Sequence, residues 1–210
     1  MASDPRQIRI LTVDDHPLLR EGIASLVGSQ PDMSIVAEAS GGKEAIEQFR
    51  RHRPDVTLMD IRMADMNGID AMAEILREFA NAKIVVLTTY SGDAQIMRAL
   101  KAGAQGYLLK GLLRKELIDT IRTVHAGRKR ISPEAASTVA DHAGESPLTL
   151  REIAVLQLIA EGNANKIVAD RLDITEDTVK AHVRSILSKL AANDRTHAVT
   201  IGLKRGIIDL

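Results

Sequence analysis

Five residues with ionisable or hydroxyl side chains follow short apolar runs, where we expect buried strands to end: Asp14, Asp15, Asp60, Thr88 and Lys110. In open α/β sheets, ligands bind outside the carboxyl ends of the strands, where such side chains converge. Three carboxylates in one pocket repel each other and call for a divalent cation. Because oxygen ligands with an open side suit Mg²⁺ or Mn²⁺ rather than zinc, these residues predict a magnesium site.

The chemistry that fits this set is transfer of a phosphoryl group to a carboxylate. Asp60 is the predicted nucleophile, activated by geometry and metal rather than by a base. Mg²⁺ on Asp15, Asp60 and the main-chain carbonyl of Arg62 would neutralise charge on the incoming group. Lys110 can hold one phosphoryl oxygen, and Thr88 can donate a hydrogen bond to another. A single such residue is usually a turn or solvated loop residue, so it is their combination at one edge that favours a site.

Alternating apolar runs and amphipathic stretches in residues 8 to about 125 provide the elements that must position these side chains. We expect strands at Ile8–Val13, Ser34–Glu38, Val56–Met59, Ile84–Thr88 and Gly106–Leu109, and helices around 17–28, 42–52, 68–79, 93–102 and 113–125. This alternation predicts an α/β fold, a doubly wound, five-stranded parallel sheet, for which we take the common flavodoxin-like order 2-1-3-4-5. In that order the first and third strands are neighbours, which brings the three aspartates together.

Four motifs in this region resemble the receiver domain of two-component response regulators: Val13-Asp14-Asp15-His16-Pro17, Leu58-Met59-Asp60-Ile61-Arg62-Met63, Leu87-Thr88 and Gly106-Tyr107-Leu108-Leu109-Lys110. The resemblance covers residues 7–126. It implies phosphorylation of Asp60 by a partner sensor histidine kinase, with Asp14 and Asp15 holding Mg²⁺. It also implies that Thr88 and Lys110 are the family's threonine and lysine. Tyr107 would be the switch aromatic, with Tyr90 as a second one.

Two departures from the receiver pattern concern loops. Ala64-Asp65 occupies the place where the family usually has a proline after the methionine, which predicts a looser loop after Asp60. Gly111 follows Lys110 where Asp or Pro is more usual, and it predicts a relaxed loop there as well. Neither departure touches the phosphorylation chemistry directly.

The alternating pattern stops at Gly127, and from Leu148 onward the sequence has no strand signal. Ser132 before Pro133 predicts a helix start, and Thr149 with Glu152 forms a predicted capping box. Further short helices are expected at Lys166 to Leu172, Glu176 to Leu190 and Arg195 to Arg205. We therefore expect a receiver domain at 1–126, a partly helical linker at 127–145 and a small all-α domain at 146–210.

The expected helix from Glu176 to Leu190 carries two lines of side chains. Its apolar stripe, which should face a core, comprises Val179, Val183, Ile186, Leu187 and Leu190. Lys180, Arg184 and Ser188 form a second line, with the small residue Ala181 beside it. Small and basic residues on an exposed face allow a helix to approach bases and phosphates in a major groove. From this helix alone, a solvated charged face is an equally good interpretation.

The whole module resembles the LuxR-type helix-turn-helix of the NarL/FixJ subfamily over residues 146–208. The motifs are Leu148-Thr149 with Arg151-Glu152, Glu161-Gly162 with Asn165-Lys166, Ala169 with Leu172, Thr178-Val179-Lys180 with His182-Val183, and Leu190 to Thr196. The resemblance implies base contacts by Lys180, Ala181 and Arg184. It implies phosphate contacts by Lys166, Thr175, Thr178, His182, Ser185 and Lys189. The last helix, through Ala198 and Ile201, resembles the family's dimerisation helix.

Three departures concern local geometry in this module. Leu150 replaces a usual proline, and Ile167 replaces a usual glutamate, so that an apolar side chain is exposed or buried differently. Ala191 replaces a common glycine at a helix end, where a left-handed backbone would be strained.

Composition narrows the classes of protein. The chain of 210 residues has no cysteine, which excludes disulfides and thiolate metal sites. Net charge is zero, but residues 178–205 hold six basic residues against one acid, the local footprint of a small DNA reader. Scarce aromatic residues argue against binding of single strands. Without a membrane-length apolar run or a signal peptide, a cytoplasmic protein is expected.

These features together predict a DNA-binding transcriptional response regulator, which dimerises on double-stranded promoter DNA when it is phosphorylated. Three alternative functions compete with this prediction. A phosphatase of the haloacid dehalogenase type generally has a second Asp two residues after its nucleophile, where this chain has Arg62. A quorum-sensing regulator would need an acyl-ligand pocket, usually rich in aromatic residues, in place of the receiver. A receiver-like domain that acts without phosphorylation would not need the complete set of five residues. We therefore expect a regulator and not an enzyme.

Overall fold

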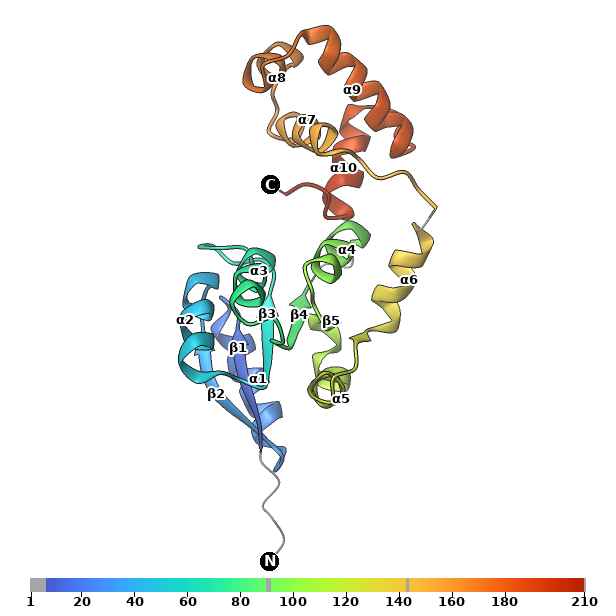
Figure 1. The fold of residues 1–210 in the computed structure, drawn as a ribbon. Helices are drawn as coiled ribbons and strands as arrows, with labels where there is room; N and C mark the ends of the chain where they lie inside the picture. The colour runs from blue at the N-terminus through green and yellow to red at the C-terminus, as the bar shows by residue number, and fades with distance from the viewer. Residues whose placement is uncertain (1–6, 90–91, 143, 210) are drawn as a thin grey trace, which may run out of the picture. The chain divides into compact units, whose positions relative to one another are not determined.

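The computed structural model describes residues 7–89, 92–142 and 144–209, and the chain divides into two compact units. Apart from Gly92–Gln95, which are grouped with the second unit, the change from one unit to the other falls between Ala136 and Ser137, inside the segment predicted as a linker. The first unit is built on a β-sheet, and the second is helical (Figure 1).

A parallel sheet forms the centre of the first unit. Its strands are β1 (Ile8–Val13), β2 (Met33–Ala39), β3 (Val56–Asp60), β4 (Ile84–Thr88), β5 (Gly106–Leu109) and β6 (Arg130–Ile131). Their order is β2-β1-β3-β4-β5-β6, and each neighbouring pair is parallel. The predicted fold class and the order of the first five strands are confirmed.

The sixth strand was not predicted, because the sequence assigned β6 to the linker. It has two residues and follows the charged pair Arg128 and Lys129, so it has no alternating apolar pattern to reveal it. Backbone hydrogen bonds hold it at the edge of the sheet. The N–H of Arg130 donates to the carbonyl of Gln105 at 2.9 Å, and the N–H of Ser132 donates to that of Tyr107 at 3.1 Å.

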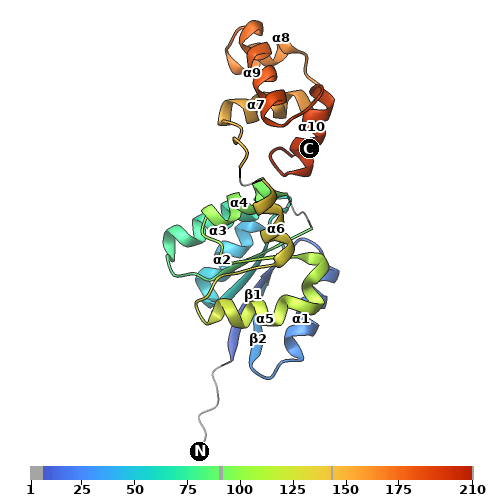
Figure 2. The same cartoon turned by 90° about the vertical axis from the view of Figure 1, so that its right-hand side faces the viewer.

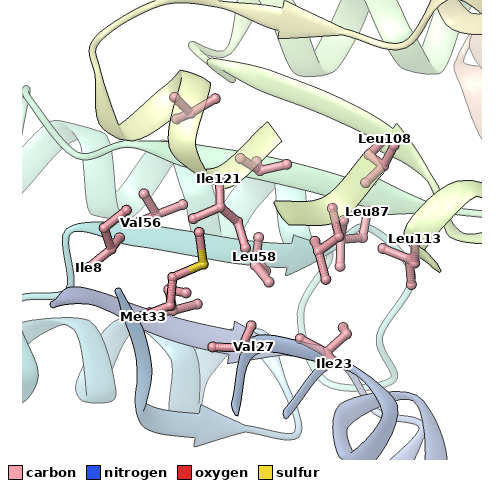
Figure 3. Packing of buried hydrophobic residues seen from close by; sticks show 14 residues of the cluster. Ile8, Ile23, Val27, Met33, Val56, Leu58, Leu87, Leu108, Leu113 and Ile121 are labelled. Carbon is pink, nitrogen blue, oxygen red and sulfur yellow. The ribbon is translucent and has the colours of Figure 1, made fainter. Parts of the chain in front are cut away.

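Helices cover both faces of the sheet. They are α1 (Pro17–Gly28), α2 (Gly42–His52), α3 (Gly68–Glu78), α4 (Asp93–Lys101), the 3₁₀ helix η1 (Lys110–Leu112) and α5 (Leu113–His125). Helices α1 and α5 lie on one face and α2, α3 and α4 on the other, as right-handed crossovers require (Figures 1 and 2). Figure 3 shows the core beneath α1 and α5, where Ile23, Val27 and Ile121 pack against Val56 and Leu58. This core fixes the strands and hence their carboxyl ends.

The helical unit contains most of α6 (Pro133–Asp141) and then α7 (Leu150–Ala160), α8 (Asn165–Leu172), α9 (Glu176–Lys189) and α10 (Arg195–Lys204). Buried side chains from α7 to α10, with Val155, Val168, Val179, Ile186 and Ala198 among them, form its core. The predicted apolar stripe of α9 faces this core, with Val183 and Leu187 partly buried. The capping box of Thr149 and Glu152 and the cap by Thr175 are both present.

The departures noted in the sequence have visible effects in this unit. Ala191 has a φ of 50°, so the expected left-handed residue is confirmed, at a cost of about 1–2 kcal/mol relative to a right-handed one. Leu150 is 88% exposed and Ile167 is 45% exposed, so both apolar side chains face solvent. No helix of the described residues is long and apolar enough to cross a membrane.

Candidate metal centre and nucleic-acid interface

The sheet places the predicted carboxylates at its carboxyl edge. Val13 of β1 pairs with Met59 of β3, so the residues that follow them, Asp14 and Asp60, are neighbours across the two strands. Thr88 pairs with Leu109 at the ends of β4 and β5, and Lys110 follows directly. Residues separated by nearly 100 positions in sequence therefore meet at one end of the sheet.

The ammonium group of Lys110 lies between two of these carboxylates. Its Nζ is 2.7 Å from Oδ2 of Asp14 and 2.8 Å from Oδ2 of Asp60. Asp14 is fully buried and Asp60 is 3% exposed, while Asp15 is half-buried. Two buried carboxylates share one ammonium group, so this cluster retains negative charge among largely buried side chains.

The pKa values of Asp60 and Lys110 reflect this imbalance. Burial raises the pKa of Asp60 and the charge of Asp14 adds to it, against the opposing effect of Lys110. Burial lowers the pKa of Lys110, but the two carboxylates outweigh it and leave that pKa above its ordinary value. Lys110 therefore stays positively charged, and the carboxylates gain from any further cation.

The donor set fits a hard divalent cation. Oxygens of Asp14, Asp15 and Asp60, with a ring nitrogen of His16, lie within 4.8 Å of one another. Oδ2 of Asp14 and Oδ1 of Asp15 are buried and within ion-pair distance of a nitrogen, yet neither accepts a hydrogen bond of good geometry. Such oxygens have lone pairs available to a metal. The acidic cluster could thus bind a cation; the contribution of the Arg62 carbonyl stays a prediction.

His16 belongs to the cluster, although the sequence did not single it out. Its Nδ1 is 2.7 Å from Oδ1 of Asp15 and 3.2 Å from Oδ1 of Asp14, and its backbone N–H donates to the latter atom at 2.9 Å. Its place directly after the aspartate pair was the available signal.

Thr88 and Tyr107 lie inside the unit on neighbouring strands. Thr88 is 1% exposed, and Tyr107 is among the largest fully buried side chains. Burial raises the pKa of Tyr107, and a hydrogen bond with Thr88 opposes that rise only in part. The predicted switch pair is therefore in direct contact. Tyr90, the second predicted aromatic, lies outside the described residues.

The helical unit contains a helix-turn-helix formed by α8 and α9. Asp173 has a left-handed backbone with φ 51°, which ends α8, and Thr175 begins α9 by accepting a hydrogen bond from the N–H of Thr178 at 3.2 Å. On α9 the predicted base-contacting residues are all exposed: Lys180, Ala181 and Arg184. An exposed ion pair of 2.9 Å joins Lys180 to Asp177, which a polyanion could displace.

The predicted phosphate contacts differ in their surroundings. Lys166 and Thr175 are exposed, whereas Thr178 and His182 are half-buried. Ser185 and Lys189 are half-buried too, and both bind the carboxylate of Glu152. Oγ of Ser185 donates to its Oε1 at 2.6 Å, and Nζ of Lys189 is 2.7 Å from its Oε2. Ser185 and Lys189 therefore have a role inside the unit, which the sequence did not predict.

Helix α10 contains Ala198 and Ile201, the residues through which it was predicted to resemble the family's dimerisation helix. Ala198 is 1% exposed and belongs to the core of its own unit, so its side chain is not available to a second chain. Ile201 is half-buried against the same core. Of the two, only Ile201 could contact a partner.

Replacing Glu152 by Gln should weaken the helical unit, because the amide carries no charge and keeps one acceptor oxygen where the carboxylate uses both to bind Ser185 and Lys189. Burial raises the pKa of Glu152, but hydrogen bonds from Lys189, Ser185 and Thr149 outweigh it and lower the pKa to about 2. The folded-state pKa thus lies below the unfolded one. The stabilisation is complete above about pH 4.5 and is lost as the pH falls towards 2.

Hydrogen exchange of the α9 amides in the full chain would measure this change. We expect a loss of about 1–3 kcal/mol of protection at neutral pH in Glu152→Gln. The matched control is Glu161→Gln, which removes an exposed pair with Arg171 and should change protection by less than about 0.5 kcal/mol. Equal protection in the two variants would show that the Glu152 network does not stabilise the unit.

Comparison with known protein families gives one match for the unit with the carboxylate cluster and one for the unit with the helix-turn-helix. Residues 10–122 match the response regulator receiver domain, and residues 146–201 match the bacterial regulatory proteins of the luxR family. The chain therefore belongs to the two-component response regulators that combine a receiver domain with a LuxR-type helix-turn-helix. Such a protein is a DNA-binding transcription regulator rather than an enzyme.

Curated relatives match over nearly their whole length. The chain is 40% identical to the uncharacterized transcriptional regulatory protein YxjL of Bacillus subtilis, with 96% of this chain and 98% of YxjL covered. It is 39% identical to the transcriptional regulatory protein LiaR of the same organism (96% and 100%). It is 37% identical to the response regulator VraR of Staphylococcus aureus (96% and 99%).

Solved structures share the fold. The response regulator ChrA of a heme-sensing two-component system is 35% identical, with a TM-score of 0.57 over 96% of this chain and 99% of ChrA. A structure of two RcsB dimers bound to two parallel DNAs has a TM-score of 0.72 over 95% and 99%, at 21% identity. At that identity, RcsB supports the fold alone.

Proposed function

We propose that this regulator is activated when a sensor histidine kinase phosphorylates Asp60, and that the phosphorylated chain binds promoter DNA as a homodimer through α9. The observation that carries the proposal is the cluster of carboxylates at the sheet edge. Asp60 is 3% exposed there, beside Asp14 and Lys110, in a chain that also has a helix-turn-helix. We place this reaction in the cytoplasm, where bacterial promoter DNA lies.

The residues of this cluster would each have a part in phosphoryl transfer. Oδ1 of Asp60 accepts a hydrogen bond from the N–H of Ile61 at 2.8 Å, which orients the carboxylate. Lys110 can move from the carboxylates to a phosphoryl oxygen, and Thr88 can donate a hydrogen bond to another. Asp14, Asp15, Asp60 and the Arg62 carbonyl would hold Mg²⁺, which when bound neutralises charge on the incoming group.

DNA recognition would follow from the exposed face of α9. We propose that Lys180, Ala181 and Arg184 meet base edges, while Lys166, Thr175, Thr178 and His182 contact phosphates. Ser185 and Lys189 remain candidates for phosphate contact, with the added duty of binding Glu152. One small module contacts few base pairs, so two copies on a partly palindromic site supply affinity and specificity. The proposed limits are 1–126 for the receiver, 127–145 for the linker and 146–210 for the DNA-binding domain.

Size-exclusion chromatography with and without acetyl phosphate tests this function. With Mg²⁺ present, acetyl phosphate should convert the chain from its resting state to a dimer. Chelation of Mg²⁺ by EDTA should prevent the change. An elution volume that does not respond to acetyl phosphate would contradict phosphorylation-driven dimerisation.

Thr88→Ala should still be phosphorylated but should no longer dimerise in response. The hydroxyl of Thr88 contacts Tyr107, and a hydroxyl drawn towards the phosphoryl group changes the packing of that ring. The variant should still take up a phosphoryl group, measured by intact mass, but lose most of the dimer seen by chromatography. Thr88→Ser, which keeps the hydroxyl, should behave like wild type. If Thr88→Ala dimerises as wild type does, Thr88 is a structural hydroxyl only.

A further inference from the structure

The loop between β3 and α3 is joined to the N-terminus of α2 by one side chain, Asp65. Its Oδ1 accepts a hydrogen bond from the N–H of Gly42 at 2.9 Å, and its Oδ2 accepts one from the N–H of Lys43 at 3.1 Å. Gly41 is the N-cap residue of α2 and has no side chain to accept these bonds. Asp65 thus supplies from another loop the acceptor that an N-cap residue usually supplies.

Two glycines give the loop room to approach α2. Gly41 has an extended backbone with φ −165°, which any residue adopts, so glycine is not needed there for its conformational freedom. A Cβ atom on Gly41 would lie 2.4 Å from Oδ1 of Asp65, and one on Gly42 would lie 2.8 Å from Cβ of Met66. Close approach of the loop explains both glycines.

The same loop carries the phosphorylation site. It begins at Asp60 and contains Arg62, whose carbonyl is a predicted metal ligand. It closes on its own strand at Gly68, whose N–H donates to the carbonyl of Ile61 at 2.8 Å. A Cβ atom on Gly68 would lie 1.8 Å from the main-chain oxygen of Asp60. The two ends of the loop are therefore held together directly after β3.

The middle of the loop is held by Asp65. Ala64 lies in the middle of the loop, where its backbone has a torsional freedom that a proline would remove. The next residue is Asp65, whose two hydrogen bonds fix the loop to α2 instead. The hydrogen bond from the N–H of Lys43 is the largest cause that lowers the pKa of Asp65, and the bond from Gly42 adds to it. The carboxylate is therefore charged at neutral pH, and a negative charge is favourable at a helix N-terminus.

We propose that Asp65 is a positioning residue of the phosphorylation site: its bonds to the N-terminus of α2 hold the loop in the shape that binds the cation beside Asp60. The proposal rests on the function proposed for Asp60. If Asp65 were a helix cap only, its loss would lower the stability of α2 without changing the affinity of the site for Mg²⁺. Metal affinity therefore distinguishes the two roles.

Titration of the full chain with Mg²⁺, followed by calorimetry, tests the proposal. Asp65→Ala should raise the Mg²⁺ dissociation constant about tenfold, as loss of a group supporting metal ligands usually does. The Mg²⁺ concentration needed for half-maximal phosphorylation by acetyl phosphate should rise by the same factor, and saturating Mg²⁺ should restore the wild-type rate. Asp65→Asn keeps an acceptor oxygen at the helix N-terminus and should retain most of the affinity.

Gly41→Ala should reproduce the effect of Asp65→Ala, because its methyl group displaces the carboxylate. Once Asp65 is alanine, adding Gly41→Ala should change the dissociation constant no further. The matched control is Asp194→Ala, which removes the cap that accepts a hydrogen bond from the N–H of His197 at 2.8 Å in the helical unit. This control should lose stability and keep the wild-type Mg²⁺ affinity.

Asp65→Ala with a lowered melting temperature and an unchanged Mg²⁺ dissociation constant would overturn the proposal and leave Asp65 as a helix cap. Additive effects of Gly41→Ala and Asp65→Ala would also contradict it. If the wild type binds Mg²⁺ but takes up no phosphoryl group, the function proposed for Asp60 fails, and the Mg²⁺ titration still decides the role of Asp65. If the wild type binds no Mg²⁺, the cation site and this proposal fail together.

Discussion

Asp60→Asn should take up no phosphoryl group from acetyl phosphate in the presence of Mg²⁺, whereas the wild-type chain should take up one. Asparagine has nearly the same shape, but its amide is not a nucleophile towards phosphorus. The loss should be complete because Asp60 is the carboxylate that ends β3 beside Lys110. Intact-mass spectrometry of both proteins over time measures the uptake.

The matched control for this experiment is Asp70→Asn. Asp70 is an exposed residue in the first turn of α3, so the variant should be phosphorylated at the wild-type rate. If Asp60→Asn were labelled at the wild-type rate, the acceptor would be another residue, and Asp14 would be the next carboxylate to test.

Replacing Lys180 and Arg184 together by alanine should abolish recognition of the cognate duplex. A good bidentate contact with a base discriminates by about 1–3 kcal/mol, so loss of two such side chains costs about 2–6 kcal/mol if their effects add. Both side chains are exposed on α9 and lie outside its apolar stripe, so the fold should survive. Titration of cognate and scrambled duplexes at several salt concentrations measures the loss.

Single alanine variants should change DNA binding in different ways in the same titrations, according to whether the lost side chain contacts a base or a phosphate. Arg184→Ala should relax the preference at one base position, whereas Lys166→Ala should weaken all sequences alike and reduce the salt dependence. Lys166 is a cleaner phosphate probe than Lys189, whose replacement also breaks the bond to Glu152. Lys204→Ala removes an exposed positive charge from α10 and serves as the control for charge alone. Cognate binding unaffected by the double replacement would show that α9 is not the reader.

The receiver-type fold could be predicted because its strands and helices carry local periodic patterns. Those patterns predicted the five strands, and the flavodoxin-like order taken for them is confirmed. With that order, the ends of the strands bring Asp14, Asp60 and Lys110 together. The two-residue strand β6 has no such pattern, since it pairs through backbone atoms only. The bond from Asp65 to α2 joins two loops, and no periodicity in either loop indicates it.

In the helical unit, too, contacts between residues close in sequence could be predicted, whereas contacts between distant residues could not. Caps at Thr149 and Thr175 were predictable because each depends on residues three positions apart. The bonds from Ser185 and Lys189 to Glu152 span more than 30 positions, and on α9 alone these residues have the spacing of a solvated face. Ala198 was interpreted from resemblance as a dimer contact, but packing within the unit buries it.

The most direct test of phosphorylation control is a titration of one cognate duplex with wild type and Asp60→Asn, each with and without acetyl phosphate and Mg²⁺. If phosphorylation of Asp60 drives dimerisation, acetyl phosphate with Mg²⁺ should raise the affinity of the wild type for the cognate duplex. Asp60→Asn should bind that duplex weakly with and without acetyl phosphate. Scrambled duplex should show little gain for either protein. An equal gain for Asp60→Asn, or none for phosphorylated wild type, would contradict control of DNA binding through Asp60.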